Sequence, residues 1–259
     1  MSGSLTDIKL SMKKIIIRTL RKKGYEIRKA PSSSFNPMPI FDLAVNYLIT
    51  KSSENLSFIQ VGANDGVFGD PLRKYILKYE WNGVFIEPQP EIYKELLINY
   101  KGLKKKLYFE NLAISNNSES ISLFRPFIGE GEINGSKSVI EKSSIASVNP
   151  TITARQFGVK ESDLEEIKVA TITLDEIVKK HQLSKLDILQ IDTEGYDWEV
   201  LKTLNLKQTR PYIIQFEHGH MNPNIIDEIS CHLRDNQYLL YFGGHESDSV
   251  AIRSDLIEL

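Results

Sequence analysis

The chain has 259 residues, 41% hydrophobic and 25% charged, which is typical of a folded globular protein with one large domain and additions. A net charge of −2 argues against a general nucleic-acid binder, and a single cysteine, Cys231, excludes an internal disulfide framework. No apolar run reaches the ~18 residues that a membrane-spanning helix needs, and no signal-peptide core is visible, so we expect a cytoplasmic protein.

The first 38 residues are predicted to form a separate basic segment. Lysine and arginine outnumber acidic residues there, and Ile8, Met12, Ile15 and Leu20 recur near helical spacing. This pattern predicts an amphipathic helix, followed by a linker rich in serine and proline. Two uses remain open: the helix docks on its own domain, or it contacts acidic lipid or a partner chain at a membrane surface.

From residue 39 to residue 259, apolar strands alternate with helical patterns. The expected strands are 58–61, 83–86, 107–114, 120–124, 186–191, 212–216, 238–242 and 250–252. The expected helices are 41–48, 71–79, 91–100, the later part of 171–181, 196–204 and 225–235. Continuous apolar strands between helices predict an α/β fold with a mostly parallel sheet that is buried on both faces.

Two regions depart from this alternation. The last two strands are joined through Gly243 and Gly244 and predict a C-terminal antiparallel hairpin. Residues 125–168 show no clear period, and such long irregular stretches are often functional loops. We therefore expect a lid or insertion there that excludes water and selects the acceptor.

The segment Phe58–Gly66 places two glycines, Gly62 and Gly66, directly after a buried strand. Glycine lets the backbone turn tightly and approach a ligand closely, and Glu87 ends the next strand, where an acid can bind ribose hydroxyls. The plain alternative is a tight turn and a solvated strand end. Asn64 stands where a dinucleotide site usually has glycine, which favours S-adenosylmethionine over a dinucleotide.

Four segments carry a resemblance to a known family. They are Ile59–Gly66, Phe85–Pro88, Asn111–Ser115, and Thr173–Asp175 together with Leu189–Gly195 and Val200–Leu201. On these motifs the chain resembles the FkbM-type methyltransferases over roughly residues 55–220. The resemblance implies a Rossmann-like class I methyltransferase sheet, S-adenosylmethionine as cofactor, and O-methylation of sugars or natural products in glycan or polysaccharide biosynthesis.

The resemblance also implies which residues bind the cofactor. Those expected at its methionine end are Gly62, Ala63, Asn64 and Gly66, those beside adenine are Asn111, Leu112 and Ala113, and Glu87 is expected at the ribose. Asp192 is a further expected contact. The family usually has an acid at the position of Gln60, near the cofactor's amino group, so we expect weaker cofactor affinity here.

The acceptor side is expected at two later strand ends. Asp192 and Glu194 follow strand 186–191, and Glu217 and His218 follow strand 212–216. Methyl transfer to a hydroxyl needs a base, for which we favour Asp192 and His218, with Glu194 and Glu217 as further catalytic candidates. Alternatively, Asp192, Glu217 and His218 hold one Mg or Mn ion. His220 is interpreted as a loop histidine, and Asp192 could simply cap the next helix.

The sequence thus predicts an S-adenosylmethionine-dependent O-methyltransferase with a small-molecule or glycan acceptor and no nucleic-acid partner. Two alternatives stay open. A nucleotide-binding oxidoreductase is disfavoured by the altered glycine pattern and the terminal hairpin. A non-catalytic cofactor-binding module of a glycan-assembly protein is supported by Gln60 and opposed by Asp192, Glu194 and Glu217. The acidic body disfavours an RNA methyltransferase.

Overall fold

Apolar strands form the central layer of the computed structural model, which describes residues 40–52, 55–79, 81–103, 106–116, 119–127, 145–242 and 248–257. These residues belong to the unit Pro39–Leu259. The predicted basic helix, its linker and the Gly243–Gly244 connection lie outside the described residues.

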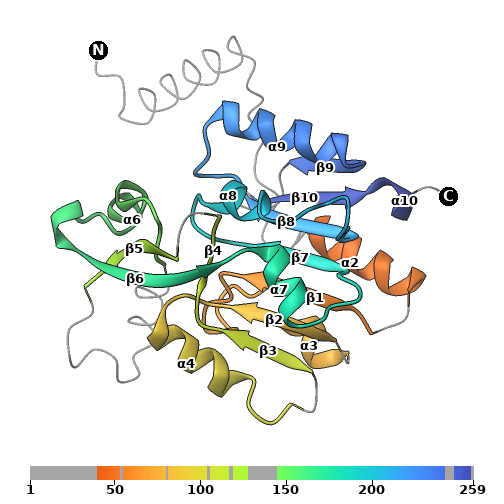
Figure 1. Cartoon of the computed structure of the whole chain (residues 1–259), viewed down its shortest axis with the longest axis horizontal. Helices are drawn as coiled ribbons and strands as arrows, with labels where there is room; N and C mark the ends of the chain where they lie inside the picture. The colour runs from red at the N-terminus through yellow and green to blue at the C-terminus, as the bar shows by residue number, and fades with distance from the viewer. Residues whose placement is uncertain are drawn as a thin grey trace, which may run out of the picture. The chain divides into compact units, whose positions relative to one another are not determined.

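Within the described residues, seven strands form one sheet in the order β3-β2-β1-β7-β8-β10-β9 (Figure 1). The strands are β1 (Ser57–Val61), β2 (Asn82–Ile86), β3 (Leu107–Glu110), β7 (Ile188–Ile191), β8 (Ile213–Glu217), β9 (Tyr238–Phe242) and β10 (Asp248–Arg253). β1, β2, β3, β7 and β8 are parallel, and β10 is antiparallel to β8 and β9, which confirms the predicted parallel sheet with a C-terminal antiparallel pair. The chain order reverses between β1 and β7, and such a switch point is where α/β sheets bind ligands.

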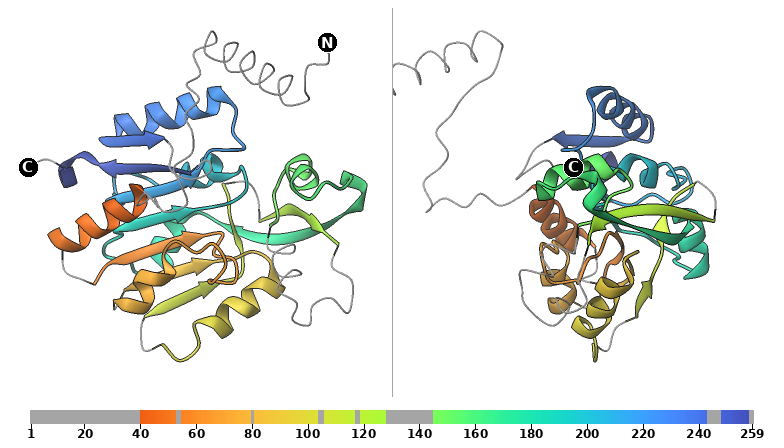
Figure 2. Two further views of the ribbon diagram at one scale, coloured as in Figure 1. Left: turned by 180° about the vertical axis from the view of Figure 1, so that it is seen from behind. Right: turned by 90° about the vertical axis from the view of Figure 1, so that its left-hand side faces the viewer.

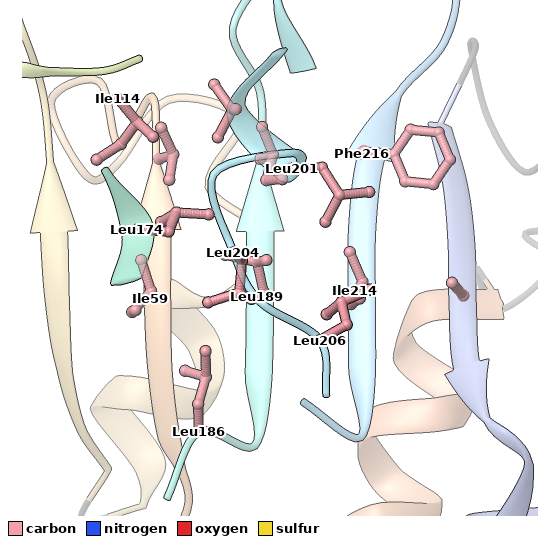
Figure 3. Packing of buried hydrophobic residues seen from close by; sticks show 14 of the residues in the cluster. Ile59, Ile114, Leu174, Leu186, Leu189, Leu201, Leu204, Leu206, Ile214 and Phe216 are labelled. Carbon is pink, nitrogen blue, oxygen red and sulfur yellow. The ribbon is translucent and has the colours of Figure 1, made fainter. Parts of the chain in front are cut away.

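The strands are apolar on both sides because helices cover both faces of the sheet (Figure 2). The helices are α2 (Ile40–Lys51), α3 (Arg73–Lys78), α4 (Pro90–Asn99), α7 (Leu174–Lys180), α8 (Asp197–Leu201), α9 (Pro223–Asp235) and α10 (Ser254–Ile257). Ile59 packs with α7, α8 and α9 in the cluster drawn in Figure 3, whereas its neighbour Phe58 packs with α2 and α3 on the other face. None of the described helices has the length and apolar character to cross a membrane.

A second sheet of three strands, in the order β4-β6-β5, projects from the larger one (Figures 1 and 2). It comprises β4 (Ala113–Ile114), β5 (Ser120–Pro126) and β6 (Leu164–Ile172). The prediction of one strand over 107–114 was therefore wrong, because the chain leaves the large sheet after Glu110 and joins the small one at Ala113. At this break, Asn111 Nδ2 donates to the carbonyl oxygens of Glu87 and Pro88 at 2.8 and 3.1 Å.

Much of the stretch expected to be irregular, 125–168, is regular. It contains α6 (Pro150–Phe157), the 3-10 turn η1 (Glu161–Asp163) and most of β6. Asn149 caps α6 by accepting from the Thr151 amide, and Gly158 ends it with φ 64°. Buried Arg125 on β5 ties this region to α4 and β6 through Glu91 at 2.7 Å and Glu165 at 3.0 Å. Residues 128–144 lie outside the description, so the lid remains a prediction.

Candidate functional site

A cavity of about 200 Å³ lies at the carboxyl ends of β1, β2 and β7, beside the switch point of the sheet. Most of the expected cofactor residues line it: Gln60, Gly62, Ala63, Asn64, Glu87, Leu112, Ala113 and Asp192. Apolar side chains of the small sheet, including Ile121 and Leu123, complete the wall. The sequence therefore identified residues from four separate segments that the fold brings to one cavity.

Gly62 is where the loops after β1 and β7 touch. Its φ is +75°, and a Cβ there would lie 1.8 Å from the carbonyl oxygen of Asp192, so a larger residue cannot fit without moving a backbone. Asn64 is also left-handed, with φ 52°, which is uncommon for a residue with a side chain. Gly66 has a different purpose: a Cβ would meet the Tyr100 ring at 2.4 Å, so this glycine permits α4 to pack and does not line the cavity.

Glu87 fixes the loops after β1 and β2 relative to each other. Its side chain is 3% exposed, and its two carboxylate oxygens accept from the amides of Asn64 at 3.0 Å and Gln89 at 2.9 Å. Burial raises the pKa of Glu87 to about 7, against the lowering effect of these hydrogen bonds. Asn111 braces the backbone of Glu87 from outside the cavity wall, so the structure does not bring it to the wall with Leu112 and Ala113.

Asp70 also lines the cavity and was missed by the sequence analysis. It accepts a hydrogen bond from Gln60 Nε2 at 3.1 Å, and Gln60 itself is 2% exposed. The only local signal was an aspartate followed by Pro71 ahead of a helix, which is also the usual signal of a cap.

On the other side of the switch point, buried Asp197 joins the loops after β7 and β8. Its oxygens accept from Thr193 Oγ1 at 2.6 Å and from the Glu217 amide at 2.8 Å. Burial raises the pKa of Asp197 to about 6. Asp192 lines the cavity and is exposed there, yet the surrounding protein and the charges of Asp197 and Glu194 raise its pKa well above the ordinary range.

Glu194, Glu217 and His220 form an acid and histidine cluster beside the cavity. His220 Nε2 lies 3.5 Å from Glu194 Oε2 and 3.7 Å from Glu217 Oε1, and Glu194 lies on the cavity wall. Glu194 has φ 53°, a strained conformation that functional sites often retain. Burial and the neighbouring carboxylates raise the pKa of Glu217 to about 9, so this group keeps its proton at neutral pH.

His218 does not join this cluster. Its Nδ1 lies 2.9 Å from Ser249 Oγ, its ring packs edge-on against Phe242, and burial lowers its pKa. Asp192, Glu217 and His218 therefore do not form the expected cation site. In the described part of the chain, the potential ligand set with all atoms within 4.8 Å is Glu194, Glu217 and His220. Which of two loop histidines faces the acids depends on the turn after β8, and sequence periodicity carries no information about it.

Comparison with known proteins identifies one protein family. The family model described as "Methyltransferase FkbM domain" matches residues 60–240. No curated protein matches the sequence significantly. Similar solved structures include the methyltransferase FkbM from Methylobacillus flagellatus KT, with 13% identity, a TM-score of 0.48 and coverage of 77% of this chain and 44% of that chain. Another is the METTL16 methyltransferase domain, with 10% identity, a TM-score of 0.45 and coverage of 85% and 70%. The chain thus spans less than half of the M. flagellatus protein.

Proposed function

The chain belongs to the FkbM methyltransferase family, and from this premise we propose that it is an S-adenosylmethionine-dependent O-methyltransferase acting on a hydroxyl of a sugar, glycan or related natural product. The observation that carries the proposal is the meeting of Gly62, Glu87 and Asp192 around one cavity at the switch point. When bound, the cofactor supplies an electrophilic methyl group, and the protein supplies binding, orientation and a base.

The residues on the cavity wall suit this cofactor. Glu87 presents a buried carboxylate at the end of β2, where it can accept from ribose hydroxyls. Gly62 and Ala63 line the end of the cavity that we assign to the methionine portion. Leu112 and Ala113 offer an apolar surface for the adenine ring.

We assign the general base to His220 in place of His218. A hydroxyl loses its proton as it attacks the methyl group, and histidine accepts protons readily near neutral pH. His220 lies within 4 Å of two carboxyl groups, and because Glu217 is held protonated, Glu194 provides the negative charge that stabilises the imidazolium. An Mg or Mn ion at Glu194, Glu217 and His220 is the alternative arrangement, and loss of activity in excess EDTA would favour it.

The acceptor is expected beside Tyr196. A second, more open cavity of about 350 Å³ is lined by residues 147–150 with Gly195 and Tyr196, and shares Val148 and Tyr196 with the first. Ser147 Oγ donates to the carbonyl oxygen of Glu194 at 2.8 Å, which fixes this cavity beside the acid and histidine cluster. The small sheet, which contributes Ile121 and Leu123 to the cavity wall, is placed to select the acceptor. A lid within residues 125–168 and contact of the basic N-terminal segment with a membrane-bound glycan carrier remain predictions from the sequence.

The proposal is tested by calorimetric titration of the purified chain with S-adenosylhomocysteine and with NAD. We expect micromolar binding of S-adenosylhomocysteine and none of NAD. Glu87→Ala should abolish S-adenosylhomocysteine binding. Glu199→Ala, which removes an exposed carboxylate on α8, should leave this binding unchanged. Failure of the wild-type chain to bind S-adenosylhomocysteine would refute the proposal, and binding of NAD would favour the oxidoreductase.

A further inference from the structure

Two glutamines that line the cavity hold buried hydrogen-bond acceptors that lack donors within the described residues. Gln60, 2% exposed, donates through Nε2 to Asp70 Oδ1 at 3.1 Å. Because a carboxylate oxygen can only accept, this contact fixes the orientation of the amide. Gln60 Oε1 is then left buried, and within the described residues it accepts no hydrogen bond. A buried acceptor without a donor is costly unless a ligand supplies one.

Gln190 on β7 repeats this situation next to Gln60. The two residues are paired in the register of β1 and β7, and both line the cavity. Gln190 is 4% exposed, and its Oε1 is also buried with no donor in the part of the chain described. Neighbouring residues of the cavity wall therefore each hold a buried amide carbonyl oxygen that needs a donor.

Asp70 adds a negative charge to the same place. Its oxygens accept from the amides of Leu72 at 2.8 Å and Arg73 at 3.1 Å, and from Tyr100 Oη at 3.0 Å. No lysine, arginine or histidine of the described ranges forms an ion pair with Asp70, since Arg73 directs Nη1 to the Gly66 carbonyl at 2.8 Å. Burial opposes the ionised form of Asp70 and raises its pKa, and a cation brought into the cavity would offset this effect.

We propose that Asp70, together with the carbonyl oxygens of Gln60 and Gln190, forms the subsite that binds the amino group of the cofactor's methionine portion. This inference rests on the proposed function. An ammonium group carries one positive charge and three N–H donors, which matches one carboxylate and two orphaned carbonyl oxygens. Asp70 thereby provides the charge that the FkbM-type resemblance places at position 60, and the expected loss of affinity from Gln60 is offset.

The competing explanation is that Asp70 only holds the turn ahead of α3. That role uses Oδ1, which accepts from the Leu72 and Arg73 amides. Asp70→Asn keeps an oxygen for these amides and removes only the charge, so it separates the two roles. Asp65→Asn is the matched control, because Asp65 Oδ1 accepts from the Val67 and Phe68 amides in the same loop while lying off the cavity wall.

The test is calorimetric titration with two ligands: S-adenosylhomocysteine, and 5′-methylthioadenosine, which lacks the amino acid portion. Asp70→Asn should weaken S-adenosylhomocysteine binding about 10- to 100-fold, the effect of one charge-assisted hydrogen bond, and leave 5′-methylthioadenosine binding unchanged. The double variant Gln60→Glu/Asp70→Asn, which moves the carboxylate to position 60, should recover most of the lost affinity. Asp65→Asn should affect neither ligand.

Other results overturn the inference. Unchanged S-adenosylhomocysteine binding by Asp70→Asn would leave Asp70 with only its structural role in the turn ahead of α3. Equal weakening of both ligands would mean that the substitution disturbs the whole cavity. A double variant as weak as Asp70→Asn would contradict the role of the charge. If the wild-type chain binds neither ligand, the proposed function fails first, and that outcome is distinct from all of these.

Discussion

The two halves of the site hold their carboxylates in different ways. After β1 and β2, Glu87 and Asp70 accept from backbone amides that have fixed positions in their loops. After β7 and β8, Glu194 and Glu217 lie beside one histidine, and burial, together with repulsion from Glu194 and Asp192, raises the pKa of Glu217 to about 9. The first half is thus rigidly preorganised for binding, whereas the second retains protons that chemistry can move.

The largest expected effect tests whether the second half carries the base. His220→Ala should lower kcat about 100- to 10,000-fold with an acceptor sugar, the usual contribution of a general base, while leaving S-adenosylhomocysteine affinity unchanged. His218→Ala is the control, because His218 contacts Ser249 and Phe242 away from the acids, and we expect near wild-type kcat. If His218→Ala lowers kcat more than His220→Ala does, His218 is the general base and the assignment to His220 is wrong.

The next largest effect is on stability, and it tests the contact between the loops after β1 and β7. Gly62→Ala would place Cβ 1.8 Å from the Asp192 carbonyl oxygen at φ +75°, and should cost on the order of 3 kcal/mol of stability. For a domain of this size that lowers Tm by about 6–12 °C. Gly102→Ala has a similar φ, +87°, with no atom within 4 Å, so it should cost only about 1 kcal/mol. Equal losses in thermal unfolding experiments would show that the loops after β1 and β7 separate freely.

The same contrast explains which parts of the site the sequence could reveal. Gly62 and Glu87 end consecutive apolar strands, so their roles follow from local pattern and strand order alone. Asp70 and His220 occupy loops, and their function depends on neighbours from other elements: Gln60 across the β1 loop for one, Glu194 across the β7 loop for the other. No spacing rule connects such pairs before the fold is known.

The fold, too, has parts that local sequence patterns predict and parts that they do not. The seven-stranded sheet was predictable because burial on both faces leaves continuous apolar runs, with the exact ends uncertain by a few residues. The small sheet was harder, since one face of β6 is solvated and its alternation of Glu166, Ile167, Lys168 and Val169 is short. The break after Glu110 was not predictable, because residues on both sides of Asn111 and Leu112 suit strands equally well.

The smallest expected effect is on the pH dependence of stability. In the folded chain Glu217 has a pKa of about 9, against an ordinary value of 4.5, so between these limits the folded state binds a proton that the unfolded state releases. Stability must then fall as pH rises through this window. Asp197, with a pKa of about 6, and Glu87, with about 7, contribute mainly below pH 7, whereas Glu217 titrates above it. Asp192, whose pKa burial and the neighbouring acids also raise, acts in the same direction.

Over this range, one proton changes stability by at most about 2 kcal/mol, so the wild-type Tm should fall by a few degrees from pH 7 to pH 9. Glu217→Gln removes the carboxyl with a pKa of about 9 and should reduce the slope, whereas Glu87→Gln should change the slope much less, because the pKa of Glu87 is about 7. A wild-type Tm that stays constant from pH 7 to 9 would mean that Glu217 is already ionised at neutral pH. His220 would then face two negative charges instead of one, and the acid cluster would favour a bound cation over a proton shuttle.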